Sequence, residues 1–125
     1  MGVILQVAVG GALGAVLRYL SVQAAMRGFG SGAYVGTFAV NFVGSVLMGL
    51  CAAWLLERAG SDRFAPFVMT GVLGGFTTFS AFSLDAFALW EQGRQGMAMA
   101  YVCGSVVLAI GGLILGMTIM RAVVS

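Results

Sequence analysis

The sequence predicts an all-α integral membrane protein with four transmembrane helices. Two features of composition point to lipid as its main solvent: 61% of the 125 residues are hydrophobic, and only 8% are charged. Six arginines and four acidic residues cannot cover the surface of a soluble domain of this size. A third feature is four long stretches almost without charge, each able to cross a hydrocarbon core about 30 Å thick as a helix.

The four predicted spans cover residues 3–24, 34–56, 64–90 and 97–121, within a single membrane domain of residues 1–125. Short connections that hold most of the charge join the spans, so no extramembrane domain fits between them. The first span lacks the basic region of a signal peptide and runs into Arg18 without a clear cleavage context. We therefore expect it to remain in the mature chain.

Small residues recur four positions apart in every span: Gly10 and Gly14, Ser45 and Gly49, Gly71 and Gly75, Gly112 and Gly116. Such pairs let helix backbones approach closely in lipid, where no hydrophobic effect drives helices together. Because the chain has 20 glycines, some of these pairs arise by chance. They predict close helix packing and say nothing about a substrate.

The six arginines divide equally between the two membrane faces: Arg58, Arg63 and Arg121 on the face of both termini, and Arg18, Arg27 and Arg94 on the other. An excess of Lys and Arg on one side normally fixes the orientation of a membrane protein, and this chain has none. The balance favours insertion in both orientations and pairing with an inverted copy of the same chain. Balance by chance is the alternative.

The third span is predicted to break near mid-membrane, within Thr70 to Asp85. The pair Gly74 and Gly75 precedes a run of hydroxyl side chains, which compete for backbone hydrogen bonds, so the segment is a poor helix interior. Irregular backbone at this depth is tolerated only where protein buries it or where it lines a hydrated path. The break is thus a candidate ion site; the alternative is a packed kink whose hydroxyls bond back to carbonyls.

Aromatic and amide side chains accompany the break. Phe76, Phe79 and Phe82 recur every three residues, and aromatic rings carry a positive edge that a small anion can approach. Asn41, the only Asn of the chain, is expected at the depth of Phe79 and Phe82 and offers N–H donors without net charge. An Asn in a membrane helix also bridges helices, and the sequence leaves both roles open.

The fourth span carries Tyr101 and Ser105 on one face, because residues four apart on a helix are neighbours. The same face continues to Ala109 and Leu113, so any polar track along it is short. Hydroxyls in this position either line a pore or hold helices together. Asp85 is expected at the edge of a vestibule or paired with an arginine, for which Arg18 is one candidate.

The two cysteines, Cys51 and Cys103, lie inside hydrophobic spans and are expected to behave as small apolar residues. With no His in the chain, they give no metal-ligand spacing.

Three segments of the sequence are similar to motifs of a known family: GGALGAVLRY at residues 10–19, GTFAVNFVGSVLMG at 36–49 and GGFTTFSAFSLD at 74–85. In this order and spacing, over essentially the whole chain, they resemble the Fluc (CrcB) family of fluoride channels. The last segment is the most specific.

The resemblance implies an antiparallel, dual-topology homodimer with two pores in the cell inner membrane, a multi-pass protein that allows passive fluoride export and lowers cytoplasmic fluoride toxicity. It also implies a structural sodium ion at the dimer axis, held by the backbone carbonyls of Gly74 and Thr77. The fluoride pathway expected on matching positions comprises Phe79, Phe82, Asn41, Ser80, Thr78, Tyr101 and Ser105, with Arg18 in an aqueous vestibule. Ala81 and Ala109 stand where relatives often carry a hydroxyl, which removes two donors.

Two other classes remain as alternatives. A small dual-topology proton-coupled drug exporter needs an acid deep in a span, and Asp85 is the only acid within one. A non-conducting structural or holin-like subunit has no need of a broken helix. An enzyme is not expected, because no cofactor motif or catalytic set is present. The expected partners are fluoride, the lipid bilayer and a second copy of the chain, with no nucleic acid.

Overall fold

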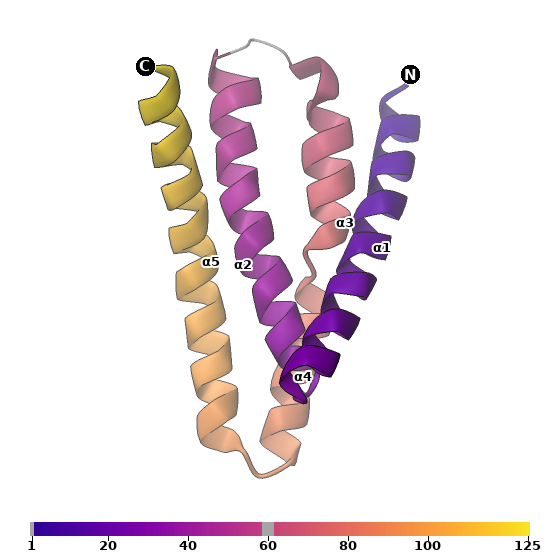
Figure 1. The fold of residues 1–125 in the computed structure, drawn as a ribbon, viewed down its shortest axis with the longest axis vertical. Coiled ribbons are helices and arrows are strands. Elements are labelled where there is room, and N and C mark those ends of the chain that lie inside the picture. The colour runs from indigo at the N-terminus through magenta and orange to yellow at the C-terminus, as the bar shows by residue number, and fades with distance from the viewer. Residues whose placement is uncertain (1, 59–61) are drawn as a thin grey trace.

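The computed structural model describes residues 2–58 and 62–125, and these are almost entirely helical (Figure 1). Four helical segments are long and apolar enough to cross a membrane: Val3–Phe29, Ala33–Glu57, Pro66–Glu91 and Gln95–Val124. The predicted fold class of an all-helical membrane protein with four long apolar helices is confirmed. The antiparallel, dual-topology homodimer stays a prediction.

The elements in chain order are α1 (Val3–Phe29), α2 (Ala33–Cys51), η1 (Ala52–Arg58), η2 (Asp62–Phe64), η3 (Pro66–Leu73), α3 (Gly74–Phe76), α4 (Phe79–Glu91) and α5 (Gln95–Val124). Segments η3, α3 and α4 together form the third span. Gly30 ends α1 in the left-handed region, at φ 61°, and its N–H donates to the carbonyl of Met26. Glycine adopts this conformation without steric cost, which lets the chain turn directly into α2.

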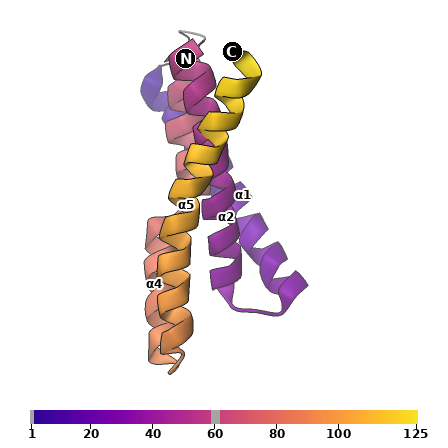
Figure 2. The ribbon, with the colours of Figure 1, turned by 90° about the vertical axis from the view of Figure 1, so that its left-hand side faces the viewer.

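Both ends of the chain lie at the same end of the molecule (Figure 1). At the other end, the hairpin of α4 and α5 extends beyond the turn that joins α1 to α2, and Figures 1 and 2 agree on this. Figure 2 also shows that the lower part of α1 diverges from α4 and α5. The most extensive contacts between helices are those of α2 with α5 and of α1 with η3.

Glycines form both of these close contacts. A Cβ added at Gly14 of α1 would lie 2.0 Å from the carbonyl oxygen of Val72 in η3. In the other pair, a Cβ at Gly49 or at Gly116 would lie 2.1 Å from a carbonyl oxygen of the facing helix. The glycine pairs therefore pack helices as predicted, whereas Ser45 of the remaining pair lines a groove described below.

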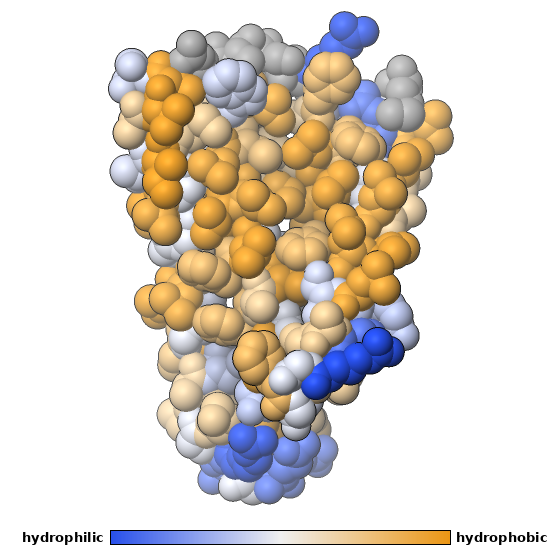
Figure 3. Space-filling model, viewed as in Figure 1, coloured by the Kyte–Doolittle hydropathy of each residue, from blue (hydrophilic) through white to orange (hydrophobic). Residues whose placement is uncertain are grey.

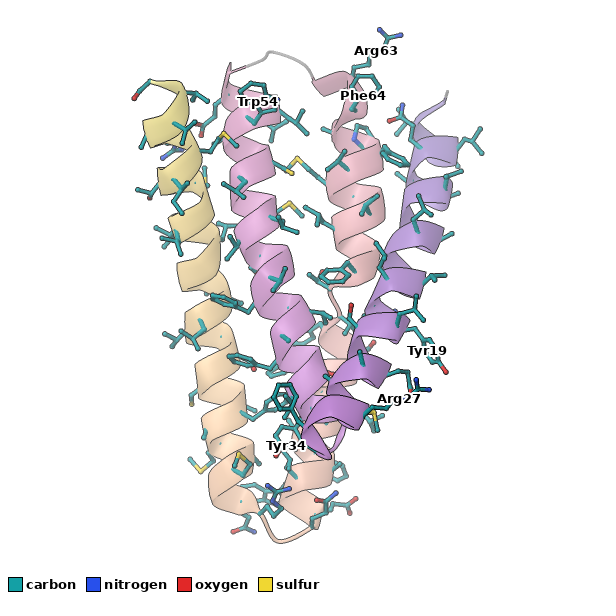
Figure 4. The ribbon with its side chains drawn as sticks, in the orientation of Figure 1. Tyr19, Arg27, Tyr34, Trp54, Arg63 and Phe64 are labelled. Carbon is teal, nitrogen blue, oxygen red and sulfur yellow. The ribbon has the colours of Figure 1, made fainter. Side chains whose placement is uncertain are left out.

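The surface of the single chain is mainly apolar. Figure 3 shows hydrophobic side chains over most of the length of the molecule, with hydrophilic ones concentrated toward the two ends. Basic and aromatic side chains lie at two levels: Trp54, Arg63 and Phe64 at the end that holds the termini, and Tyr19, Arg27 and Tyr34 toward the other end (Figure 4). Such belts are typical of the two interfaces of a bilayer.

The third span is interrupted at Thr77 and Thr78, as its glycine and hydroxyl content predicts. Both residues have extended backbone, with φ −89° and ψ 158° at Thr77 and φ −151° and ψ 124° at Thr78. Helix α3 ends before them and α4 begins after them. Extended backbone leaves carbonyl and N–H groups without helical partners. The function of the break depends on which groups bond them instead.

Candidate functional site

The break opens onto a groove of about 350 Å³ between α2, α4 and α5. Its walls are mostly apolar, and the polar side chains that line it are Asn41, Ser45, Thr77, Thr78 and Ser105. Phe79 and Phe82 also line it, so the structure brings together most of the predicted pathway residues. Ala109, at the end of the predicted polar track on α5, lines the same groove.

Asn41 bonds the backbone of the break in two ways. Its Nδ2 donates to the carbonyl of Thr78 at 3.0 Å, and its Oδ1 accepts from the N–H of Thr78 at 2.7 Å. The sequence left open whether this amide faces an anion or bridges helices, and in the structure it bridges α2 to the break. Two of its hydrogen-bonding groups are therefore used, and one Nδ2–H is left.

Thr78 connects the break to the next helix. Its Oγ1 accepts the N–H of Ala81 at 3.1 Å, which is an N-cap of α4, and lies 3.3 Å from Oγ of Ser80. The N–H groups of Phe79 and Ser80 donate to no acceptor within the residues that the structure describes. The positive end of the α4 dipole thus meets the groove with unpaired donors.

Arg18 reaches the break from α1. Its Nε donates to the carbonyl of Gly75 at 3.1 Å, and the side chain is half-buried. Because α1 continues to Phe29, Arg18 lies nearer the middle of its helix than the predicted span suggested. In the described part of the chain, its recorded partner is this carbonyl and no carboxylate.

Backbone carbonyls of the break fall into two groups. Those of Gly75 and Thr78 accept hydrogen bonds from Arg18 and Asn41, whereas those of Gly74 and Thr77 accept none from residues 2–58 and 62–125. The two free oxygens fit a hard monovalent cation such as sodium, which unwound membrane helices bind through carbonyls. Two oxygens from one chain do not complete a coordination shell. No group of three or more His, Cys, Asp or Glu occurs among the described residues.

Four rings run from the groove toward the α4–α5 turn. Phe79 and Phe82 have ring centroids 5.4 Å apart, Phe82 and Tyr101 5.2 Å, and Tyr101 meets Tyr34 at 5.8 Å with an interplanar angle of 82°. The Arg94 guanidinium lies 5.6 Å from the centroid of the Tyr34 ring. Phe82 is buried, but Phe79 is 77% exposed in the single chain.

Tyr101 and Ser105 occupy one buried face of α5, as their spacing predicts. Tyr101 donates its hydroxyl to Oδ2 of Asp85 at 3.3 Å, so the recorded partner of Asp85 is Tyr101 and not Arg18. The Oγ of Ser105 is buried without a hydrogen-bond partner in the described part of the chain. A buried hydroxyl that lines a groove and lacks a partner is available to a solute.

The sequence did not predict that Tyr34 and Thr37 of α2 lie beside the predicted pathway residues. Thr37 is 2% exposed, and Tyr34 makes the contacts with Tyr101 and Arg94. Both share a face of α2 with Asn41, being seven and four residues before it. That periodicity was the available signal.

Comparisons with known proteins agree on one family. The family model described as CrcB-like protein, Camphor Resistance (CrcB), matches residues 5–117. A "Fluoride-specific ion channel FluC" of Cereibacter sphaeroides is 56% identical over 118 residues, which are 94% of each chain. Proteins of the same name from Paracoccus denitrificans and Novosphingobium aromaticivorans are 50% and 49% identical, over 94% of this chain and 93% and 94% of theirs. The resemblance seen in the three sequence segments is confirmed, and the chain belongs to the CrcB family.

Proposed function

We propose that this chain is a fluoride-specific ion channel. The observation that carries the proposal is 56% identity, over 94% of both chains, to a protein of that name. The groove supports it physically, because neutral donors and ring edges converge there on a break in a membrane-spanning helix. The proposal places the protein among channels and not among enzymes.

Fluoride is small and strongly hydrated, so a pore must replace its water with several donors while keeping each contact weak enough to release the ion. The spare Nδ2–H of Asn41, the hydroxyl of Ser105 and the N-terminal amide of α4 at Phe79 are neutral donors at the groove. The hydroxyl of Ser80 lies next to it, 3.3 Å from Oγ1 of Thr78. The edges of Phe79 and Phe82 add positive potential. None of these groups carries a net charge that would trap the anion.

A second copy of the chain completes the pore in this proposal. Phe79 lines the groove yet is 77% exposed, so one wall is missing in the single chain. The equal division of six arginines between the two faces favours an inverted partner, which gives an antiparallel, dual-topology homodimer with two equivalent pores.

A sodium ion at the two-fold axis is part of the same proposal. The free carbonyls of Gly74 and Thr77 supply two oxygens, and Gly74 is exposed, so an inverted copy could supply two more. When bound, the ion supplies a fixed positive charge and satisfies carbonyls that lipid cannot. In the single chain, the carbonyl oxygens of Gly74 and Thr77 accept no hydrogen bond from the described residues, which leaves them available to the ion.

The physiological role in this proposal is passive fluoride export. A passive channel in the bacterial inner membrane lets fluoride leave the cell down its gradient, which lowers cytoplasmic fluoride toxicity. The protein would be a multi-pass component of that membrane.

Efflux from proteoliposomes loaded with fluoride and chloride tests the proposal. We expect rapid fluoride release with chloride retained, and loss of the fluoride release in Phe79→Ile. Equal release of both ions, or none of either, would contradict a fluoride-specific channel. Unchanged flux in Phe79→Ile would favour a leak outside the groove.

A further inference from the structure

The break is held by one side chain of α1 and one of α2. Arg18 Nε donates to the carbonyl of Gly75 at 3.1 Å. Asn41 takes both backbone groups of Thr78, at 3.0 Å and 2.7 Å. Among the described residues, these are the side-chain hydrogen bonds that tie the backbone of the break to other helices.

We propose that Arg18 and Asn41 are positioning residues that decide which carbonyls of the break stay free for a cation and where α4 begins. This inference rests on the proposed function and its cation site. By occupying the carbonyls of Gly75 and Thr78, the two side chains leave those of Gly74 and Thr77 as the free oxygens. The pattern of occupied and free carbonyls is thus set by side chains of other helices.

Asn41 suits this task because a carboxamide has a donor and an acceptor side by side, which matches the N–H and C=O of one extended residue. Thr78 is extended, and its own hydroxyl caps α4 at Ala81. A fixed Thr78 therefore fixes the first residue of α4, which is Phe79. Through this chain of contacts, Asn41 determines where the rings of Phe79 and Phe82 stand in the groove.

Arg18 acts at the Gly75 carbonyl with two opposed effects. Its hydrogen bond removes the Gly75 carbonyl from the set of free oxygens, whereas its charge repels a cation bound at the neighbouring carbonyls. Gln separates the two effects, because Nε2 of Gln follows Cδ just as Nε of Arg does. Arg18→Gln can keep the hydrogen bond without the charge, and Arg18→Met keeps neither.

The test measures sodium binding in the purified full chain without fluoride, as the rise of the melting temperature when sodium replaces N-methyl-D-glucamine. We expect Asn41→Leu and Arg18→Met to weaken the apparent sodium affinity at least tenfold. Arg18→Gln should bind sodium as tightly as the wild type or more tightly. Thr118→Ala is the control, since the exposed Thr118 hydroxyl lies outside the groove and donates to the carbonyl of Ile114 in its own helix, and it should leave the affinity unchanged.

Hydrogen exchange of the Thr78 amide gives a second readout that needs neither ion. Loss of one hydrogen bond worth about 1.4 kcal/mol corresponds to about tenfold faster exchange, which we expect in Asn41→Leu and not in Thr118→Ala. If Asn41→Leu does not fold, Asn41→Asp replaces it. A protonated Asp offers the same donor and acceptor as Asn, so its sodium affinity should recover as the pH is lowered.

The outcomes separate the inference from the function. Wild-type sodium affinity and wild-type Thr78 exchange in both Asn41→Leu and Arg18→Met, with fluoride flux reduced, would overturn the positioning role and assign the loss of flux to direct contact with the ion. Absence of any sodium effect on the wild type would overturn the cation half of the inference. In that case, unchanged hydrogen exchange of the Thr78 amide in Asn41→Leu would also overturn the inference that Asn41 fixes the start of α4. Fluoride flux tests the proposed function independently of both results.

Discussion

Tyr101 of α5 donates its hydroxyl to the Asp85 carboxylate of α4, with 3.3 Å between the oxygens. The contact joins a carboxylate to the third of the four rings that run from Phe79 through Phe82 and Tyr101 to Tyr34. A carboxylate near an anion path raises the energy of the anion, and a hydroxyl directed at it offsets part of that charge. The pair therefore links helix packing to the electrostatics of the proposed pore.

Removal of the Tyr101 hydroxyl should slow fluoride efflux. In Tyr101→Phe the ring stays between Tyr34 and Phe82, but Asp85 loses its recorded partner. We expect fluoride efflux from proteoliposomes to fall about tenfold, which corresponds to a barrier higher by roughly 1.4 kcal/mol. The loss of stability should be small, about 1 kcal/mol, because the hydrogen bond is long.

Tyr19→Phe is the control for that experiment, since Tyr19 is 63% exposed. Its flux should equal that of the wild type. Wild-type flux in Tyr101→Phe as well would show that the Asp85 carboxylate does not act on the permeating ion.

The contact between α2 and α5 should be intolerant of a single methyl group at Gly116. A Cβ there would lie 2.1 Å from the carbonyl oxygen of Val46, a distance that forces the helices apart. We expect Gly116→Ala to lower the melting temperature in detergent by several degrees, since overpacking typically costs about 1–3 kcal/mol.

Gly111 offers a matched comparison on the same helix, because a Cβ built there meets nothing within 4 Å. Gly111→Ala should be neutral or slightly stabilising, since Ala is the better helix former. Equal melting temperatures for Gly111→Ala and Gly116→Ala would contradict the close approach of α2 and α5.

Much of this architecture was predictable because lipid imposes simple rules on a sequence. Long apolar stretches must become helices, and a run such as Gly74 to Ser80 cannot continue one at low cost. The family motif then located the groove residues Asn41, Phe79 and Phe82. The four-residue spacing from Tyr101 placed Ser105 on the same helix face, and the structure shows its hydroxyl buried in the groove.

Individual hydrogen bonds were beyond prediction because they depend on helix rotation and on exact depth. The amide of Asn41 could equally have faced an ion, and only the position of Thr78 shows that its oxygen and one N–H are occupied. Likewise, Arg18 was a plausible partner for Asp85 until α1 proved to bring it to Gly75. Tyr34 escaped notice because it lies at the start of α2, where the connection obscures its helical spacing.

Removal of sodium should destabilise the protein if the carbonyls of Gly74 and Thr77 hold this ion. Replacement of sodium by N-methyl-D-glucamine, a cation too large for the site, leaves these oxygens unsatisfied. We expect a lower melting temperature and slower fluoride efflux, both restored when sodium is added back. Restoration by potassium at equal concentration would argue against a site of fixed size.

Ser105→Ala should separate stability from conduction. The Oγ of Ser105 is buried and makes no hydrogen bond to the described residues, so the folded chain bears the cost of an unsatisfied polar group, about 1–3 kcal/mol. Removal of that oxygen should leave the melting temperature equal to the wild-type value or raise it. If the hydroxyl serves the anion, fluoride efflux should nonetheless fall.

Thr118→Ala on the same helix provides the comparison, because the Thr118 hydroxyl donates to the carbonyl of Ile114 at 2.8 Å and is exposed. We expect it to change neither fluoride efflux nor the melting temperature by much. A drop in melting temperature for Ser105→Ala with wild-type flux would mean that the hydroxyl has a structural partner, such as a second copy of the chain, and does not contact the ion. A pore-facing hydroxyl predicts that Ser105→Ala keeps or raises the melting temperature and lowers fluoride efflux, because the permeating ion is then the hydrogen-bond partner of the buried oxygen.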